Sequence, residues 1–223
     1  MPMLHVLRVF TGDDGAGGNP LGVFLDGPSI PPEQRQAVAA DVGFPETVFV
    51  DDARRGRVRM FTPTVELGFA GHPLVGTAWL LATEERPVNA LRPPGGEVPV
   101  RQEGGLSFVA GRPEWAPPFE HHKLDHPAQV DALDGPPEGY GAVGCWAWED
   151  ESAGLVRCRV FAAPLGIDED EATGGHAVLL AAALRRPLVI HQGEGSTILA
   201  RPLDEGFVEI GGRVALVVRR DYE

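Results

Sequence analysis

Two glycine-marked helix starts stand out among the residues that could do chemistry. Each is a short string before an apolar run: Gly71-His72 before residues 73–82, and Gly174-Gly175-His176 before residues 177–184. A helix N-terminus presents unpaired N–H groups and the positive end of a dipole, so it can bind a carboxylate without a basic side chain. Two such ends facing one cleft could hold a small acid from both sides. The alternative is that the glycines only permit tight turns from loop to helix.

The histidines beside these glycines are not equivalent. His72 lies at the helix start next to Pro73, where its ring is expected to point toward the cleft, and it is a candidate catalytic residue. His176 lies one residue deeper in its helix, which favours a structural role. Three more histidines in a proline-rich stretch are expected on the solvated surface: His121, His122 and His126.

Glu46 is the first candidate for moving a proton. It stands immediately before the apolar string Thr47-Val48-Phe49-Val50, which is typical of a buried strand. A carboxylate at such an edge can be partly desolvated, and desolvation raises its pKa toward the range useful for proton transfer to and from carbon. The alternative is a glutamate that begins a strand and faces solvent.

Asp170 is the second candidate carboxylate and lies in the acidic loop 168–171, just before Thr173 and the glycines. Helix capping explains the acidic charge, because carboxylates favour the start of a helix and Thr173 can cap it. Capping does not explain the Thr-Gly-Gly-His string. The ligand alternation of an EF-hand is absent, and no metal site is predicted.

These candidates lie in a unit that occurs twice. Residues 59–63 and 159–164 are similar strand-like strings, and each is followed by a loop and one of the glycine-marked helices. Duplication predicts two lobes, residues 1–115 and 116–223, with the last strand free to return to the first lobe. Each helix is apolar on nearly every face, so a sheet is expected to wrap around it. The predicted fold class is α+β, with a ligand cleft between two pseudo-symmetric lobes.

Periodicity and turn residues predict the remaining elements. Helices are expected at 31–42, 72–83, 128–133 and 175–184, and strands at 5–10, 21–25, 47–50, 57–61, 98–102, 106–109, 188–191, 197–200, 207–210 and 214–219. Residues 112–118 read as a proline-rich linker. A hairpin around residues 149–154 is expected to place Cys145 opposite Cys158; two reduced core thiols are favoured over a disulfide.

Composition limits the class of partner. The chain has 223 residues, a formal net charge of −13 and 43% hydrophobic residues. The negative charge argues against nucleic acid and anionic membrane surfaces as partners. The apolar runs are far shorter than the ~20 residues that span a bilayer, and no secretory signal opens the chain. A soluble, cytoplasmic protein is therefore expected.

Five strings, in order, resemble the PhzF-like (phenazine biosynthesis) isomerases of the diaminopimelate epimerase-like superfamily. They are Gly18-Asn19-Pro20, Glu46-Thr47-Val48-Phe49-Val50, Phe61-Thr62-Pro63-Thr64 with Glu66, Gly71-His72-Pro73, and residues 169–175. The resemblance covers residues 5–184, with a weaker tail beyond.

The resemblance implies a cofactor-independent isomerase, often a homodimer, with the active site between two lobes. By position, Glu46 matches the family's proton-shuttling glutamate, and His72 and Asp170 match the histidine and aspartate beside it. Asn19 lies in the site's N-terminal loop. The substrate-binding residues that it implies are Asn19, Gly71, Thr173, Gly174 and Gly175, and the founding enzymes act on a dihydro-3-hydroxyanthranilate.

The chain also departs from the family pattern. Glu171 stands where a proline is usual, Gly175 where a serine is usual, and Arg8 where the first strand usually has an aspartate. The second lobe is expected to be shorter than in the family. Two hypotheses follow: an isomerase that moves a proton between carbons of a small, cyclic carboxylic acid, or a non-catalytic protein of the same fold that binds a small anion. A hydrolase or lyase has no supporting motif.

Overall fold

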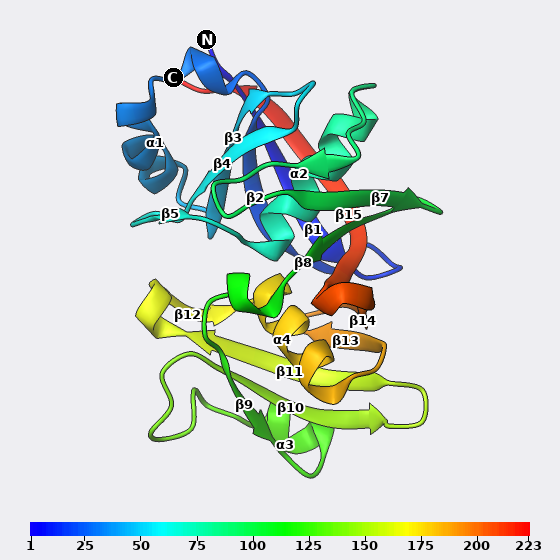
Figure 1. Ribbon diagram of the computed structural model, residues 1–223. Coiled ribbons are helices and arrows are strands. Elements are labelled where there is room, and N and C mark those ends of the chain that lie inside the picture. Colours follow the sequence, from blue (N-terminus) through cyan, green and yellow to red (C-terminus); the bar gives the residue numbers. More distant parts are fainter.

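The computed structural model describes residues 1–223, which form two lobes stacked one above the other (Figure 1). Each lobe is a curved set of strands around one apolar helix. The two helices point their N-termini toward the junction between the lobes. This arrangement confirms the predicted α+β fold of two similar lobes.

The first lobe is a sheet closed around helix α2 (Gly71–Thr83). Its strands are β1 (Met3–Thr11), β2 (Gly17–Phe24), β3 (Glu46–Asp52), β4 (Arg57–Phe61), β5 (Glu66–Leu67), β6 (Ala90–Leu91), β7 (Val98–Glu103) and β8 (Leu106–Gly111). An isolated bridge between Arg57 and Arg92 brings the β4 and β6 edges together. Ten of the 13 residues of α2 are buried, as its apolar sequence requires. Helix α1 (Arg35–Val42) lies outside this sheet and ends at Gly43, whose φ is 71°.

The second lobe repeats the plan around helix α4 (Gly174–Leu184). Its strands are β9 (Glu120–Lys123), β10 (Val143–Asp150), β11 (Leu155–Ala162), β12 (Ile167–Asp170), β13 (Leu188–Gln192) and β14 (Ser196–Pro202), and a short helix, α3 (Pro127–Asp131), packs on β10 and β11. The strand order is β14-β13-β11-β10-β9, with β12 folded back on β11.

The last strand, β15 (Val208–Asp221), runs through both lobes. Its first residues pair with β8 and β14, and the rest pairs with β1. The prediction of two separate strands here is wrong, because Gly211 and Gly212 continue the strand instead of turning it. A Cβ on Gly211 would lie 2.2 Å from the Phe108 ring, and one on Gly212 would lie 2.9 Å from the Phe10 ring. These glycines allow two phenylalanines to pack on the strand.

The predicted register of the cysteine hairpin is wrong by one residue. Cys145 lies opposite Arg159, and Cys158 lies opposite Trp146. The register shifts between Trp148 and Asp150, where the strand contains an extra residue, so the hairpin does not fold symmetrically about its turn. Both cysteines are buried free thiols, which agrees with the expectation of reduced core residues.

Residues 116–141 contain more order than their composition predicts. The expected short helix is α3, but the strand β9 was not expected, and it pairs in parallel with β10. The expectation of solvated histidines is correct only in part. His121 is exposed, yet its Nδ1 lies 3.0 Å from Nε2 of the buried His176.

No helix of the structure is long and apolar enough to cross a membrane. The division of the chain at residues 115 and 116 stays a prediction. The path of β15 through both lobes means that the C-terminal strand is shared between them.

Candidate active site

The N-termini of α2 and α4 touch at the junction of the lobes. A Cβ built on Gly71 would lie 2.8 Å from the Cα of Gly174, and one built on Gly174 would lie 2.9 Å from the Cα of Gly71. Neither glycine has a positive φ, so the tight-turn alternative does not explain them. They are required because the two backbones approach each other more closely than any side chain allows. Gly175 is different, since a Cβ there would meet nothing nearer than 3.6 Å.

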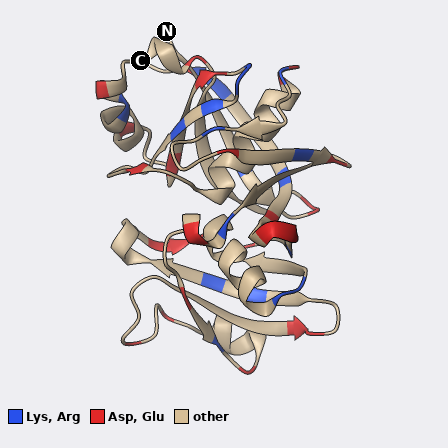
Figure 2. Ribbon diagram, in the orientation of Figure 1, with Lys and Arg blue, Asp and Glu red and all other residues tan.

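A cavity of about 60 Å³ lies beside these helix ends and takes its walls from both lobes. Seven of the eight predicted site residues line it: Glu46, Gly71, His72, Asp170, Thr173, Gly174 and Gly175. No lysine or arginine lines the cavity. Basic and acidic residues are both present elsewhere on the two lobes (Figure 2). Neither helix has a side-chain cap, so N–H groups of the first turn remain available to a ligand.

Glu46 and His72 form a buried pair on one wall. Glu46 is the first residue of β3, and its Oε2 lies 3.3 Å from Nε2 of His72. Burial, and then the negative charge of Asp170, raise the pKa of Glu46 well above its ordinary value. Burial lowers the pKa of His72 to about 3, although a hydrogen bond with the Pro20 backbone acts in the opposite direction. Because both groups favour their neutral forms, this contact is not an ion pair, and neither of the two atoms has a hydrogen-bond partner.

Asp170 is held from two sides on the facing wall. Asn19 Nδ2 donates to Oδ1 at 2.7 Å, and Thr173 Oγ1 donates to Oδ2 at 2.7 Å. Burial raises the pKa of Asp170 to about 6, although these two hydrogen bonds favour the ionised form. Asn19 itself does not line the cavity. It lies behind Asp170 and also donates to the Ala172 carbonyl at 2.9 Å, so it positions the aspartate.

Gln192 is a member of this network that the sequence did not reveal. Its Nε2 donates to the Asp170 carbonyl at 2.7 Å and to Thr173 Oγ1 at 2.9 Å, and its Oε1 accepts from the Thr173 N–H at 3.1 Å. Gln192 is the last residue of β13, after three apolar residues and His191, and no local pattern marks it as a site residue. It fixes the loop that leads into α4.

Glu171, which stands where the family pattern has a proline, is part of a chain of hydrogen bonds between the lobes. Glu171 Oε1 accepts a hydrogen bond from Ser196 Oγ at 2.6 Å, and Ser196 Oγ accepts one from the Gly18 N–H at 2.8 Å. Gly18 and Asn19 belong to strand β2 and not to a loop as expected, because residues 17–20 already pair with β1, so this chain of contacts ties β2 to the second lobe. Glutamate at position 171 therefore links the two lobes beside Asp170.

Apolar residues complete the cavity and were also missed. Leu67 and Ile167 come from the short strands β5 and β12, and Phe119 comes from the segment after the expected linker. His176 does not line the cavity. It is fully buried, and Phe119 packs edge-on against its ring, which agrees with the structural role expected for it.

No group of three or more His, Cys, Asp or Glu side chains is arranged to hold a metal ion. The polar groups of the cavity are instead two buried carboxyls, a neutral imidazole and the free N–H groups of two helices. This set can bind an anion and carry a proton beside it.

Comparison with known proteins agrees with this geometry. A family model described as phenazine biosynthesis-like protein matches residues 7–113. The trans-2,3-dihydro-3-hydroxyanthranilate isomerase of Pseudomonas aeruginosa is 30% identical over an alignment 227 positions long, which covers 82% of this chain and 80% of that enzyme. The chain belongs to the PhzF family of isomerases.

Other proteins match over a shorter span or in fold alone. The isomerase of the same name from Pseudomonas fluorescens is 48% identical over 64 residues, so the match spans only 23% of that enzyme. A putative PhzC/PhzF protein from Clostridium difficile has a TM-score of 0.81 at 19% identity, with both chains fully covered. A hydroxyproline epimerase from Agrobacterium vitis shares the fold more distantly, with a TM-score of 0.63 at 11% identity, covering 98% of this chain and 91% of that one.

Proposed function

We propose that this PhzF-family isomerase moves a proton between two carbons of a small, unsaturated, cyclic carboxylic acid, without a cofactor, and that Glu46 carries the proton. The observation that supports this most directly is the buried Glu46 carboxyl on the wall of a cavity that also contains two helix N-termini. A homodimer and a cytoplasmic location stay predictions.

The substrate carboxylate is proposed to bind between Gly71 and Gly174. No cation lines the cavity, so backbone N–H groups and the dipoles of α2 and α4 must balance the negative charge. Leu67, Ile167 and Phe119 then surround the body of the acid. Such a site suits one carboxylate on a small apolar ring.

The raised pKa of Glu46 suits it to both halves of a proton shuttle. When ionised it is a stronger base than an ordinary carboxylate, and when protonated it can return the proton as a general acid. It removes a proton from a carbon activated by neighbouring unsaturation and returns that proton to a second carbon. One C–H bond breaks, another forms and the double bonds shift, with no net oxidation or reduction.

His72 and Asp170 are proposed to orient the reacting groups. Neutral His72 lies 3.3 Å from Glu46 and can hold its carboxyl in one rotamer. Asp170, fixed by Asn19 and Thr173, can accept a hydrogen bond from an amine or hydroxyl of the substrate. The relative from Pseudomonas aeruginosa is named for trans-2,3-dihydro-3-hydroxyanthranilate, which has such groups and is the first acid to test.

Deuterium uptake in D₂O tests this proposal. We expect the wild-type protein to convert trans-2,3-dihydro-3-hydroxyanthranilate, or a related dihydroaromatic acid, and to incorporate solvent deuterium at carbon. Glu46→Gln should lose the activity, whereas Glu33→Gln, on an exposed turn, should keep it. Incorporation that persists in Glu46→Gln would rule out the assigned base.

A non-catalytic anion-binding role is the second candidate, and Gly175 is the observation that favours it. Glycine places no hydroxyl at the cavity wall where the family pattern has serine. This alternative predicts thermal stabilisation by dihydroaromatic acids with no deuterium uptake, and nearly equal affinity in Glu46→Gln.

A further inference from the structure

The two lobes contain the same Arg-x-Arg-x-Phe string in equivalent strands. It spans residues 57–61 in β4 and residues 157–161 in β11. After each strand the chain folds back as a short antiparallel strand, β5 or β12, and then enters the helix whose N-terminus faces the cavity. The second arginine of each string contacts this return strand.

The contact has the same geometry in both lobes. Arg59 Nε and Nη2 donate to the two carboxylate oxygens of Glu66 at 2.6 and 2.5 Å. Arg159 Nε and Nη2 donate to the two oxygens of Glu169 at 2.7 and 2.7 Å. Each guanidinium also lies near the phenylalanine two residues on: the Arg59 Cζ is 5.5 Å from the Phe61 ring centre. The Arg159 Cζ is 5.2 Å from the equivalent ring.

The residue after each glutamate lines the cavity. Leu67 follows Glu66 in β5, and Asp170 follows Glu169 in β12. In a strand, neighbouring side chains point to opposite faces, so fixing the glutamate on the outer face fixes its neighbour on the inner face. The arginine–glutamate pairs therefore hold the two strands that form opposite walls of the cavity.

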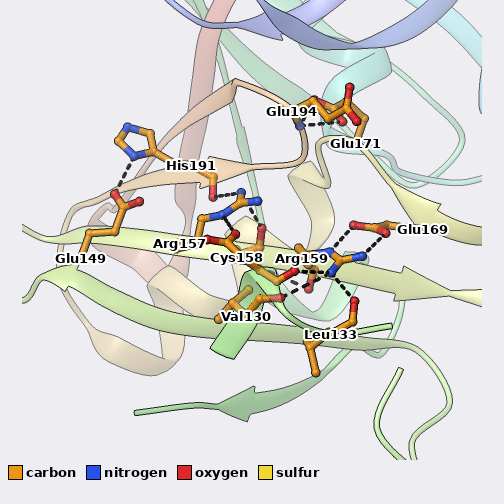
Figure 3. Close-up of polar contacts among 11 residues, drawn as sticks. Val130, Leu133, Glu149, Arg157, Cys158, Arg159, Glu169, Glu171, His191 and Glu194 are labelled. Atoms are coloured by element: carbon orange, nitrogen blue, oxygen red, sulfur yellow. Dashed lines mark hydrogen bonds and ion pairs between the residues drawn. The ribbon is translucent and has the colours of Figure 1, made fainter. Parts of the chain in front are cut away.

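Arg159 donates a further hydrogen bond beyond its contacts with Glu169. Its Nη1 donates to the Leu133 carbonyl at 2.5 Å, so one guanidinium joins β11, β12 and the end of the α3 segment (Figure 3). Arg157 is two residues earlier on the same face but binds Asp131 at 2.7 Å and the His191 carbonyl at 3.1 Å, with no contact to β12. Arg157 is thus a matched control for Arg159.

We propose that Arg59–Glu66 and Arg159–Glu169 are duplicated positioning pairs, which set the walls of the active site without touching the substrate. The effect on catalysis rests on the proposed function; the effect on the return strands does not. Isolated surface ion pairs contribute little. These pairs differ because they are bidentate, stack near an aromatic ring and are partly shielded, the Arg159 side chain being 18% exposed.

Hydrogen exchange followed by mass spectrometry tests the structural half on the free protein. Arg159→Lys keeps the charge but loses the bidentate geometry, so amides of residues 163–172 should exchange about fivefold faster, equivalent to roughly 1 kcal/mol. Glu169→Gln should have the same effect, and Arg157→Lys should change exchange there by less than about twofold. Arg59→Lys should act on residues 62–68, with Arg57→Lys as its control. Equal exchange in Arg159→Lys and Arg157→Lys would overturn the proposal.

Steady-state kinetics with trans-2,3-dihydro-3-hydroxyanthranilate tests the functional half. Arg159→Lys should lower kcat about tenfold with little change in KM, because Asp170 moves relative to the reacting atoms. Arg59→Lys should mainly raise KM, since Leu67 only surrounds the substrate. Unchanged kinetics together with faster exchange would reject a positioning role. If the wild-type protein does not turn over the acid, the proposed function fails, and the pairs are then judged by hydrogen exchange alone.

Discussion

The contact between the two helix ends predicts opposite effects for neighbouring glycines. A methyl group on Gly174 would lie 2.9 Å from the Cα of Gly71 and 3.0 Å from the N of His72. Ordinary contacts are about 3.5–4.0 Å, so in Gly174→Ala the helix ends must separate by roughly 0.6–1.1 Å. At Gly175 the nearest atoms are side-chain carbons at 3.6 Å, and alanine fits without movement.

The expected change in stability follows from these distances. Overpacking of this kind costs about 1–3 kcal/mol, and the higher helix propensity of alanine returns at most about 1 kcal/mol. Gly174→Ala should therefore lower stability by about 1–2 kcal/mol, or Tm by roughly 2–8 °C for a chain of this length. Gly175→Ala should leave Tm unchanged or raise it by up to about 4 °C.

Activity should separate the two variants further, because the same displacement widens the proposed anion site. A misplacement of about 1 Å can cost up to about 100-fold in rate. Scanning calorimetry and deuterium uptake, run side by side on both variants, give the comparison. If Gly174→Ala matches Gly175→Ala in both measurements, the helix ends do not form a rigid anion site, and the reasoning is refuted.

Three further predictions concern buried polar groups. Asn19→Ala removes a hydrogen bond to the Asp170 carboxylate, so the pKa of Asp170 should rise above about 6, seen by NMR titration of that carboxyl; an unchanged value would contradict the assigned contact. Glu46→Gln should raise Tm at pH 8 but not near pH 4.5. Burial raises the folded-state pKa of Glu46, so stability present below pH 4.5 is lost as pH rises through that raised pKa; a gain independent of pH would argue against it. Gly144→Ala should lower the free energy of unfolding by about 3 kcal/mol or more, measured in urea, because its Cβ would lie 1.9 Å from Nε2 of His176; a neutral effect would mean that the ring moves freely.

Local sequence pattern was sufficient to place the residues that begin elements. Glu46 stands at the start of an apolar strand and His72 follows a glycine at a helix start, so the neighbouring residues made both of them candidates, and the family resemblance favoured them over the solvent-facing and structural alternatives. The two-lobed fold was predictable because the string of strand, loop and glycine-marked helix occurs twice in the sequence. Seven of the eight predicted residues line one cavity, and six of them lie at the helix starts or in the loop before them, which the repeat brings to one junction.

Long-range contacts explain what could not be predicted. Gln192 meets Asp170 and Thr173 only because β13 ends beside the loop before α4, and no local string records that proximity. The register of the cysteine hairpin depends on one extra residue near Trp148, which alternation cannot reveal. Separate strands were expected at residues 207–210 and 214–219, yet Gly211 between them continues β15, and an aromatic ring from β8 occupies the space of its side chain.

The charge of this protein makes its anion site physically demanding. A chain of net charge −13 is proposed to bind a carboxylate beside Glu46 and Asp170, with no lysine or arginine in the cavity. A third negative charge in this space is unfavourable, and burial together with the charge of Asp170 raises the pKa of Glu46. The raised pKa makes the ionised Glu46 carboxylate a stronger base toward the bound acid. The same burial therefore gives Glu46 the proton-transfer properties that the proposed isomerisation requires.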